Sequence, residues 1–170
     1  YSLKSIINKA GHKTNLYTSP HLLSYTERYI FDDKEINEED LIELLTDVEK
    51  TLGDDNATLF EILTCAFLKY AENFKNNINI IEAGLFHQFD STNVFKENLM
   101  TLIGVIHNDH FQWLENKSIE GVIYEKTAKL LNSNIFINKQ VNNEIREKIE
   151  KSLEKNTSNK YFFGKDFNIA

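Results

Sequence analysis

The chain has 170 residues, which is enough for one domain with a sizeable core. Its 26 acidic and 19 basic residues leave a net charge of −7, which argues against a general nucleic-acid binder. The apolar runs are too short to span a bilayer and the start shows no signal peptide, so we expect no membrane partner. The single cysteine, Cys65, excludes a disulfide framework and fits a reducing cytoplasm.

Helical and strand patterns alternate along the chain. In chain order they predict a helix over 2–10, a strand over 14–18, helices over 37–52 and 58–74, a strand over 78–81, a strand over 99–106, a helix over 118–131, a strand over 135–137, a helix over 142–153 and a strand over 161–163. This alternation predicts an α/β fold, with a mostly parallel sheet and helices on both faces. No linker, repeat or low-complexity stretch suggests a second domain, so we expect one domain over 1–170.

Two helices carry clear start signals. Asn37 is expected to cap the helix over 37–52, whose first turn is acidic and complements the helix dipole. Thr58 and Glu61 fit a capping box at the start of the helix over 58–74. Apolar residues wrap most of the circumference of that second helix, which predicts that it is buried against the sheet.

The Ile-rich strand over 78–81 is followed by Glu82, and we expect this strand to be buried. In open α/β sheets, ligands bind beyond the carboxyl ends of the strands, where Glu82 would lie. Mg²⁺ takes few protein carboxylates and shares them with phosphate oxygens, so Glu82 is a candidate metal ligand. The alternative is a glutamate that only caps the strand or faces water.

The segment from Glu82 to Asn93, E-A-G-L-F-H-Q-F-D-S-T-N, resembles the E-V-G-L-G-G-R-L-D-A-T-N signature of folylpolyglutamate synthase/dihydrofolate synthase, a branch of the Mur ligase family. Four more stretches follow the order of that family. They are Y-T-S-P-H-L at 17–22 with E-R at 27–28, T-x-F-E at 58–61, D-H-x-x-x-L at 109–114 and E-K at 125–126. The resemblance covers nearly the whole chain and implies the ATP-binding central domain of such an enzyme.

The resemblance implies an ATP-dependent ligase that adds L-glutamate to dihydropteroate or folate through an acyl phosphate. Phosphoryl transfer depends on metal and cationic groups that hold the phosphates, so ATP and Mg²⁺ are the expected cofactors. The family pattern implies Ser19, Glu82 and His110 as metal ligands, and we expect these groups to lie within roughly 8 Å of one another. It also implies a set of substrate- and nucleotide-binding residues, namely Ser19, Pro20, His21, Asp90, Thr92 and Asn93.

These residues also have simpler interpretations. Ser19 would suit a turn before Pro20, and Asp90, Thr92 and Asn93 are ordinary turn formers. Lys126 matches the lysine that is carbamylated in the family and would act beside His110 as a catalytic group. Carbamylation requires the neutral amine, and the alternative is an exposed helix lysine next to Glu125.

The chain departs from the family pattern in several places. The family's Gly-Gly-Arg is replaced here by Phe86, His87 and Gln88. Two positions without side chains therefore become bulky, and the planar, positively charged guanidinium of the arginine is lost. The first strand, the phosphate loop and the C-terminal glutamate-ligase domain have no counterpart, the chain begins at Tyr1, and its only methionine is Met100. We therefore expect a fragment, to which a separate chain could supply the first segment. The rival interpretations are a non-catalytic remnant that keeps the fold and a peptidoglycan-precursor ligase of the same superfamily.

Overall fold

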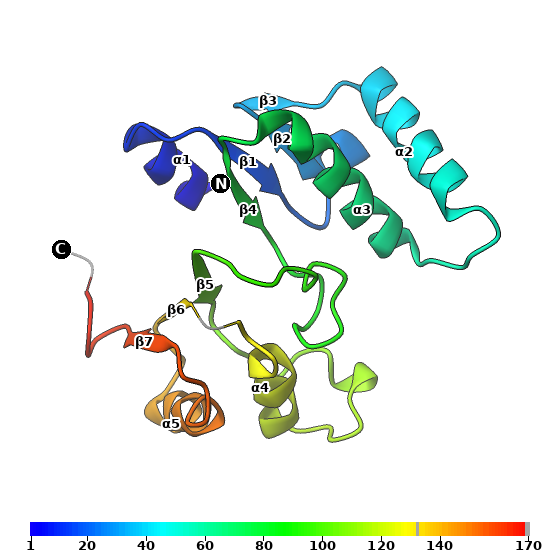
Figure 1. Cartoon of the computed structure of the whole chain (residues 1–170). Coiled ribbons are helices and arrows are strands. Elements are labelled where there is room, and N and C mark those ends of the chain that lie inside the picture. The colour runs from blue at the N-terminus through cyan, green and yellow to red at the C-terminus, as the bar shows by residue number, and fades with distance from the viewer. Residues whose placement is uncertain (132, 169–170) are drawn as a thin grey trace. The chain divides into compact units, whose positions relative to one another are not determined.

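The computed structural model describes residues 1–131 and 133–168 (Figure 1). The chain divides into two compact units, Tyr1–Gly84 and Leu85–Ala170, which are described here one at a time. Among the described residues, no helix is both long enough and apolar enough to cross a membrane. The expectation of one domain over 1–170 stays a prediction.

The first unit contains a four-stranded sheet in the order β3-β2-β1-β4 (Figure 1). Its strands are β1 (Thr14–Tyr17), β2 (Tyr29–Phe31), β3 (Lys34–Glu35) and β4 (Ile78–Ile81). Strand β4 runs parallel to β1, whereas β1 with β2 and β2 with β3 are antiparallel. The strands β1 and β4 were predicted, and the short hairpin β2–β3 was missed. Its turn residues, Asp32 and Asp33, both have positive φ, at 50° and 71°.

Three helices accompany this sheet, and all three were predicted from the sequence. They are α1 (Ser2–Lys9), α2 (Glu38–Leu52) and α3 (Leu59–Ala71), and two 3₁₀ segments, η1 (Tyr25–Arg28) and η2 (Glu72–Phe74), complete the unit. The Asn37 side chain accepts a hydrogen bond from the Asp40 N–H at 2.8 Å, so the predicted cap of α2 is confirmed. The capping box of Thr58 and Glu61 at α3 is confirmed as well.

Strand β1 is buried on both faces. Its alternate residues point to opposite sides of the sheet. On one side the Thr14 hydroxyl donates to Asn8 Oδ1 of α1 at 2.7 Å. On the other side the Tyr17 ring stacks on Phe67 of α3, with 5.0 Å between the ring centroids. Helices therefore cover both faces of this strand, as the sequence predicts for the fold.

The core of the first unit is rich in aromatic rings and lies between α3 and the sheet. Phe67 is fully buried there, and Leu63 and Ala66 of the same helix are buried beside it. The predicted packing of α3 against the sheet is confirmed, but its apolar circumference is not all buried, because Leu59 is 58% exposed and Cys65 is exposed. Only one face of this helix meets the sheet.

The second unit is built on a three-stranded parallel sheet in the order β5-β6-β7. Its elements are β5 (Met100–Ile103), η3 (Phe111–Trp113), α4 (Ile119–Thr127), β6 (Asn134–Ile137), α5 (Asn143–Ser152) and β7 (Asn159–Phe162). Ile135 and Ile137 of β6 pack with Val122, Ile149 and Phe162 in its core. Helix α4 ends earlier than the predicted 131, because Ala128 is extended and Lys129 has a φ of 58°.

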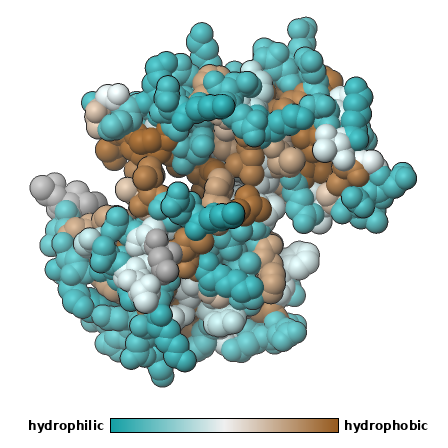
Figure 2. Space-filling model, viewed as in Figure 1, coloured by the Kyte–Doolittle hydropathy of each residue, from teal (hydrophilic) through white to brown (hydrophobic). Residues whose placement is uncertain are grey.

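Three of the five strand pairings among the described residues are parallel, and helices alternate with strands, so the predicted α/β class is confirmed. The expectation that the strand over 78–81 is buried was wrong, and the strand predicted over 99–106 is buried only at Ile103 and Ile106. Both β4 and β5 are edge strands of their own sheets. Met100 and Leu102 of β5 are 44% and 51% exposed. The face in Figure 2 is mostly hydrophilic, with hydrophobic patches between the polar side chains.

Candidate functional site

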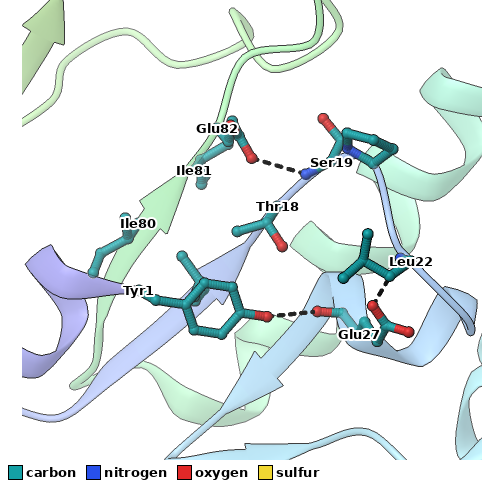
Figure 3. Close-up of a pocket in the computed structure, with 10 residues that line it drawn as sticks. Tyr1, Thr18, Ser19, Leu22, Glu27, Ile80, Ile81 and Glu82 are labelled. Atoms are coloured by element: carbon teal, nitrogen blue, oxygen red, sulfur yellow. Dashed lines mark hydrogen bonds between the residues drawn. The ribbon is translucent and has the colours of Figure 1, made fainter. Parts of the chain in front are cut away.

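Ser19 and Glu82 meet at the carboxyl edge of the first sheet. Strands β1 and β4 are parallel and in register, with Tyr17 opposite Ile81, so the residues after each strand leave the sheet side by side. The backbone N–H of Ser19 donates to Glu82 Oε2 at 2.8 Å (Figure 3). An exposed carboxylate and a serine are thus brought together from positions 63 residues apart in the sequence.

A cavity of about 450 Å³ opens beside this contact (Figure 3). Apolar side chains from β1, β4 and the loop after β1 form part of its wall, and oxygen-bearing side chains form the rest. The lining residues are Tyr1, Leu16, Thr18, Ser19, Pro20, Leu22, Glu27, Ile80, Ile81 and Glu82. An apolar wall with a few polar groups is the usual character of a small-molecule site.

Pro20 and His21 lie in the same loop as Ser19. The Ser19–Pro20 peptide bond is cis. The His21 ring packs on Tyr25, with 4.2 Å between ring centroids, and its Nδ1 accepts a hydrogen bond from Arg28 Nε at 3.0 Å. Of these three consecutive predicted residues, Ser19 and Pro20 line the cavity and His21 packs beside it on Tyr25.

Glu27 also lines this cavity, although its match to the E-R pair of the family implied no role for it. Its carboxylate accepts hydrogen bonds from three consecutive backbone N–H groups, those of Leu22, Leu23 and Ser24, at 2.7–2.8 Å. Ser24 and Glu27 also form the capping box of η1. A Ser three residues before a Glu is the signal that could have revealed this arrangement.

Asp90, Thr92 and Asn93 form a compact turn in the second unit. Asp90 Oδ1 accepts hydrogen bonds from the Thr92 N–H at 3.0 Å and from the Thr92 hydroxyl at 2.6 Å. The Asn93 N–H donates to the Asp90 carbonyl at 2.9 Å. These contacts are those of turn formers, and the binding role of the three residues stays a prediction.

Phe86 contacts two other predicted site residues of the second unit. Its ring meets the His110 ring edge-on at 6.0 Å between centroids, and Lys126 Nζ lies 5.7 Å from its centre. Lys126 Nζ also donates to the Leu85 carbonyl at 3.0 Å. His110 lies 3.8 Å from Asp109, measured between His110 Nε2 and Asp109 Oδ2. The bulky residue that replaces a family glycine is thus packed against both functional candidates.

His87, which stands beside Phe86, is tied to the end of α4. Its backbone N–H donates to the Glu125 carbonyl at 3.1 Å. Burial is the main cause that lowers the pKa of the His87 imidazole below its usual value, although a hydrogen bond with the Lys129 backbone and the charge of Asp90 act in the opposite direction. The segment that replaces Gly-Gly-Arg is therefore anchored to α4 by backbone as well as side-chain contacts.

The Phe86 ring and the Leu85 carbonyl both engage the Lys126 amine. A cation is attracted to the face of an aromatic ring and an ammonium donates to a carbonyl, whereas CO₂ reacts with the neutral amine. We expect no carbamate signal from Lys126 in ¹³C NMR spectra recorded with labelled bicarbonate. The Phe86→Gly variant should gain that signal, and a Lys126→Gln variant should lack it. A carbamate signal in the unaltered chain that Lys126→Gln removes would contradict this expectation.

The three predicted metal ligands, Ser19, Glu82 and His110, are divided between the two units. Ser19 and Glu82 belong to the first unit and His110 to the second, so their convergence stays a prediction. No group of three or more His, Cys, Asp or Glu that could hold a metal occurs within residues 1–131 and 133–168. A site that uses a serine and shares its metal with phosphate oxygens does not need such a group.

Comparisons with known proteins show similarity over segments of more than 100 residues, well beyond the short motifs. No protein-family model matches the chain. Over 133 residues it is 35% identical to the dihydrofolate synthase/folylpolyglutamate synthase of Bacillus subtilis, a match that covers 74% of the chain and 30% of that protein. It is 33% identical over 113 residues to the Escherichia coli protein of the same name, covering 66% of the chain and 26% of that protein. The chain is a homologue of the dihydrofolate/folylpolyglutamate synthases.

Solved structures of this family agree with the fold of the chain. The bifunctional folylpolyglutamate synthase/dihydrofolate synthase of Yersinia pestis, complexed with AMPPNP and Mn ion, matches with a TM-score of 0.86 and 25% identity, over 99% of the chain and 40% of that protein. Escherichia coli FolC in complex with ADP matches with a TM-score of 0.86 and 26% identity, over 98% of the chain and 40% of that protein. The predicted Mur-ligase-type α/β fold is confirmed, and the chain spans less than half the length of these relatives.

Proposed function

We propose that the chain is the central part of an ATP-dependent ligase that adds L-glutamate to dihydropteroate or folate through an acyl phosphate. The observation that carries this proposal is the contact of Ser19 with Glu82 at the carboxyl edge of β1 and β4. It places two oxygen-bearing residues of the family motifs together, beside a cavity with an apolar wall. The relatives support it further, because one is complexed with AMPPNP and Mn ion and another, Escherichia coli FolC, with DHPP and ADP.

The residues at this edge fit a magnesium ion. Mg²⁺ prefers hard oxygen ligands and is usually held by one or two carboxylates together with phosphate oxygens. The exposed Glu82 carboxylate and the Ser19 hydroxyl are donors of this kind, and His110 is proposed as a further ligand. A bound Mg²⁺ would offset the negative charge that develops on the transferred phosphoryl group. The chain itself orients the Glu82 carboxylate, through the hydrogen bond of 2.8 Å that the Ser19 N–H donates to Glu82 Oε2.

The remaining roles are proposed on the same basis. Pro20 and His21 would bind substrate at the cavity, and Asp90, Thr92 and Asn93 would lie beside the nucleotide and the pterin. Lys126 would serve the site as a catalytic group beside His110, with its Nζ held by the Leu85 carbonyl and the Phe86 ring. L-Glutamate as the second substrate, a separate chain for a further segment and a cytoplasmic location are further parts of this proposal.

A chimaera tests the ligase function. The part of this chain that matches the Bacillus subtilis protein replaces its counterpart there, and ADP release is measured with Mg²⁺, ATP, dihydropteroate and L-glutamate. We expect ADP release that requires both acceptor and glutamate. Because Glu82 is the proposed metal ligand, Glu82→Gln should lower the rate by about 100-fold or more, the scale expected when a group that stabilises transition-state charge is lost.

The matched control is Glu39→Gln, because Glu39 is an exposed acidic residue in the first turn of α2, on a different element. It should leave the rate within about twofold of the parent chimaera, since exposed surface substitutions have small effects. Two results would overturn the proposal. One is a chimaera that unfolds cooperatively like the Bacillus protein but releases no ADP, and the other is full activity in Glu82→Gln.

A further inference from the structure

The loop that follows β1, residues 18–24, carries Ser19, and its two leucine side chains are not packed against the core. Its Leu22 and Leu23 side chains are 90% and 94% exposed. An exposed loop has conformational freedom that folding must remove at a cost of about 1–2 kcal/mol per residue. Polar contacts must therefore supply the order of this loop.

The Glu27 carboxylate supplies the densest set of these contacts. Oε2 accepts from the Leu22 N–H at 2.8 Å (Figure 3), and Oε1 accepts from the N–H groups of Leu23 and Ser24, both at 2.7 Å. Hydrogen bonds to an ionised acceptor are about twice as strong as neutral ones. The hydrogen bonds from Leu22, Ser24 and Leu23 hold the pKa of the Glu27 carboxyl below its usual value, so it is ionised at neutral pH.

Arg28 closes the other side of the same loop. Its carbonyl accepts from the Thr18 N–H at 3.2 Å, and its Nε donates to His21 Nδ1 at 3.0 Å. Its guanidinium also lies over the Tyr25 ring, 5.6 Å from the centroid. Together with the Ser19 contact to Glu82, these bonds fix the loop at both ends and in its middle.

We propose that Glu27 is a positioning residue, which holds the 18–24 loop in the one shape that keeps Ser19 against Glu82 and Leu22 at the cavity. Residues 22–24 form the middle of this loop. Among the contacts described for their backbone N–H groups, those with the Glu27 carboxylate are the ones that hold them in place. The consequence for substrate rests on the proposed ligase function. The consequence for loop order does not.

Glutamine is the informative replacement at position 27, because it has the same length but one acceptor oxygen instead of two. The NH₂ group of glutamine would face a backbone N–H group, and these two cannot form a hydrogen bond because both are donors. At least one of the three hydrogen bonds is then lost. Aspartate keeps both oxygens on a side chain that is one methylene shorter, so Glu27→Asp should restore part of the order.

A nitroxide at position 23 reports the order of the loop in the full 170-residue chain. Cys65 is the single cysteine and is exposed, so Cys65→Ser with Leu23→Cys gives one labelling site. Because Leu23 is 94% exposed, the label displaces no packed side chain. We expect a broad, immobile spectrum in the parent and a clearly narrower, mobile one in Glu27→Gln, with Glu27→Asp between them.

The matched control is Glu61→Gln. Glu61 holds the equivalent position in the capping box of α3, where its Oε2 accepts from the Thr58 N–H at 2.7 Å. Both variants lose a capping-box contact and should lower the midpoint of thermal unfolding, but only Glu27→Gln should mobilise the label. Equal label mobility in parent and Glu27→Gln, with both chains folded by circular dichroism, would overturn the proposal.

The chimaera separates this inference from the proposed function. There Glu27→Gln should raise the KM for dihydropteroate about 10- to 100-fold, the range for residues that orient a binding group, with a smaller change in kcat. A mobile label together with an inactive parent chimaera would leave the positioning role and remove the ligase function. If the parent chimaera is active and the label stays immobile in its Glu27→Gln variant, the ligase function is kept and the positioning role is removed.

Discussion

Replacing Phe67 by alanine should lower the free energy of unfolding of the first unit by about 3–5 kcal/mol, the usual cost of removing a buried phenylalanine. Phe67 is fully buried in α3, and its ring centroid lies 5.0 Å from that of Tyr17 and 5.2 Å from that of Phe31. The truncation removes apolar surface from the core and leaves a cavity between α3 and the sheet. Since whole domains are stable by only about 5–15 kcal/mol, this loss is large.

Urea unfolding followed by circular dichroism measures the effect, and Leu59→Ala is the control. Leu59 is in the same helix but is 58% exposed, so its truncation should cost less than about 1 kcal/mol. A Phe67→Ala midpoint close to that of Leu59→Ala would show that the aromatic core does not hold this unit together.

Replacing Gly121 by alanine should destabilise the second unit by about 1–3 kcal/mol or more. A Cβ atom at Gly121 would lie 2.1 Å from the Asn116 carbonyl oxygen, which is backbone and cannot swing away. That oxygen also accepts the Ser118 N–H at 2.8 Å, so the turn before α4 is tight. Alanine is the better helix former by about 1 kcal/mol, and the steric clash should outweigh this gain.

Gly104→Ala is the matched control, because a Cβ there would meet nothing within 4 Å. Thermal unfolding of the two variants should therefore differ by several degrees, since about 1 kcal/mol shifts the midpoint of a small domain by about 4–8 °C. Equal midpoints would mean that the turn at Asn116 relaxes freely.

The helix caps of this chain could be predicted because they depend on residues that are close together in the sequence. The caps at Asn37 and at Thr58 with Glu61 depend on hydrogen bonds between residues three apart, so four letters suffice to predict them. The same rule also predicts the capping box of Ser24 with Glu27, because these two residues are three apart as well. The α/β class followed from the alternation of helical and strand patterns.

Sheet neighbours and burial were decided by the tertiary structure. The hairpin β2–β3 has strands of three and two residues, too short for a periodic signal, and it forms because β2 pairs with β1. The Ile-rich runs of β4 and the apolar β5 indicate core strands, yet both lie at sheet edges. Hydrophobicity shows that a segment can be buried, but only its neighbours decide how much of it is.

The candidate site divides in the same way. The sequence by itself determined that Ser19 and Glu82 each follow a strand, and the family motifs singled out both residues. Only the tertiary structure decided that β1 and β4 are parallel neighbours in register, so that the Ser19 N–H reaches the Glu82 carboxylate at 2.8 Å. It also decided that Phe86 packs against Lys126 and His110. Such contacts join residues far apart in the chain, and no local pattern records which distant partner a side chain will meet.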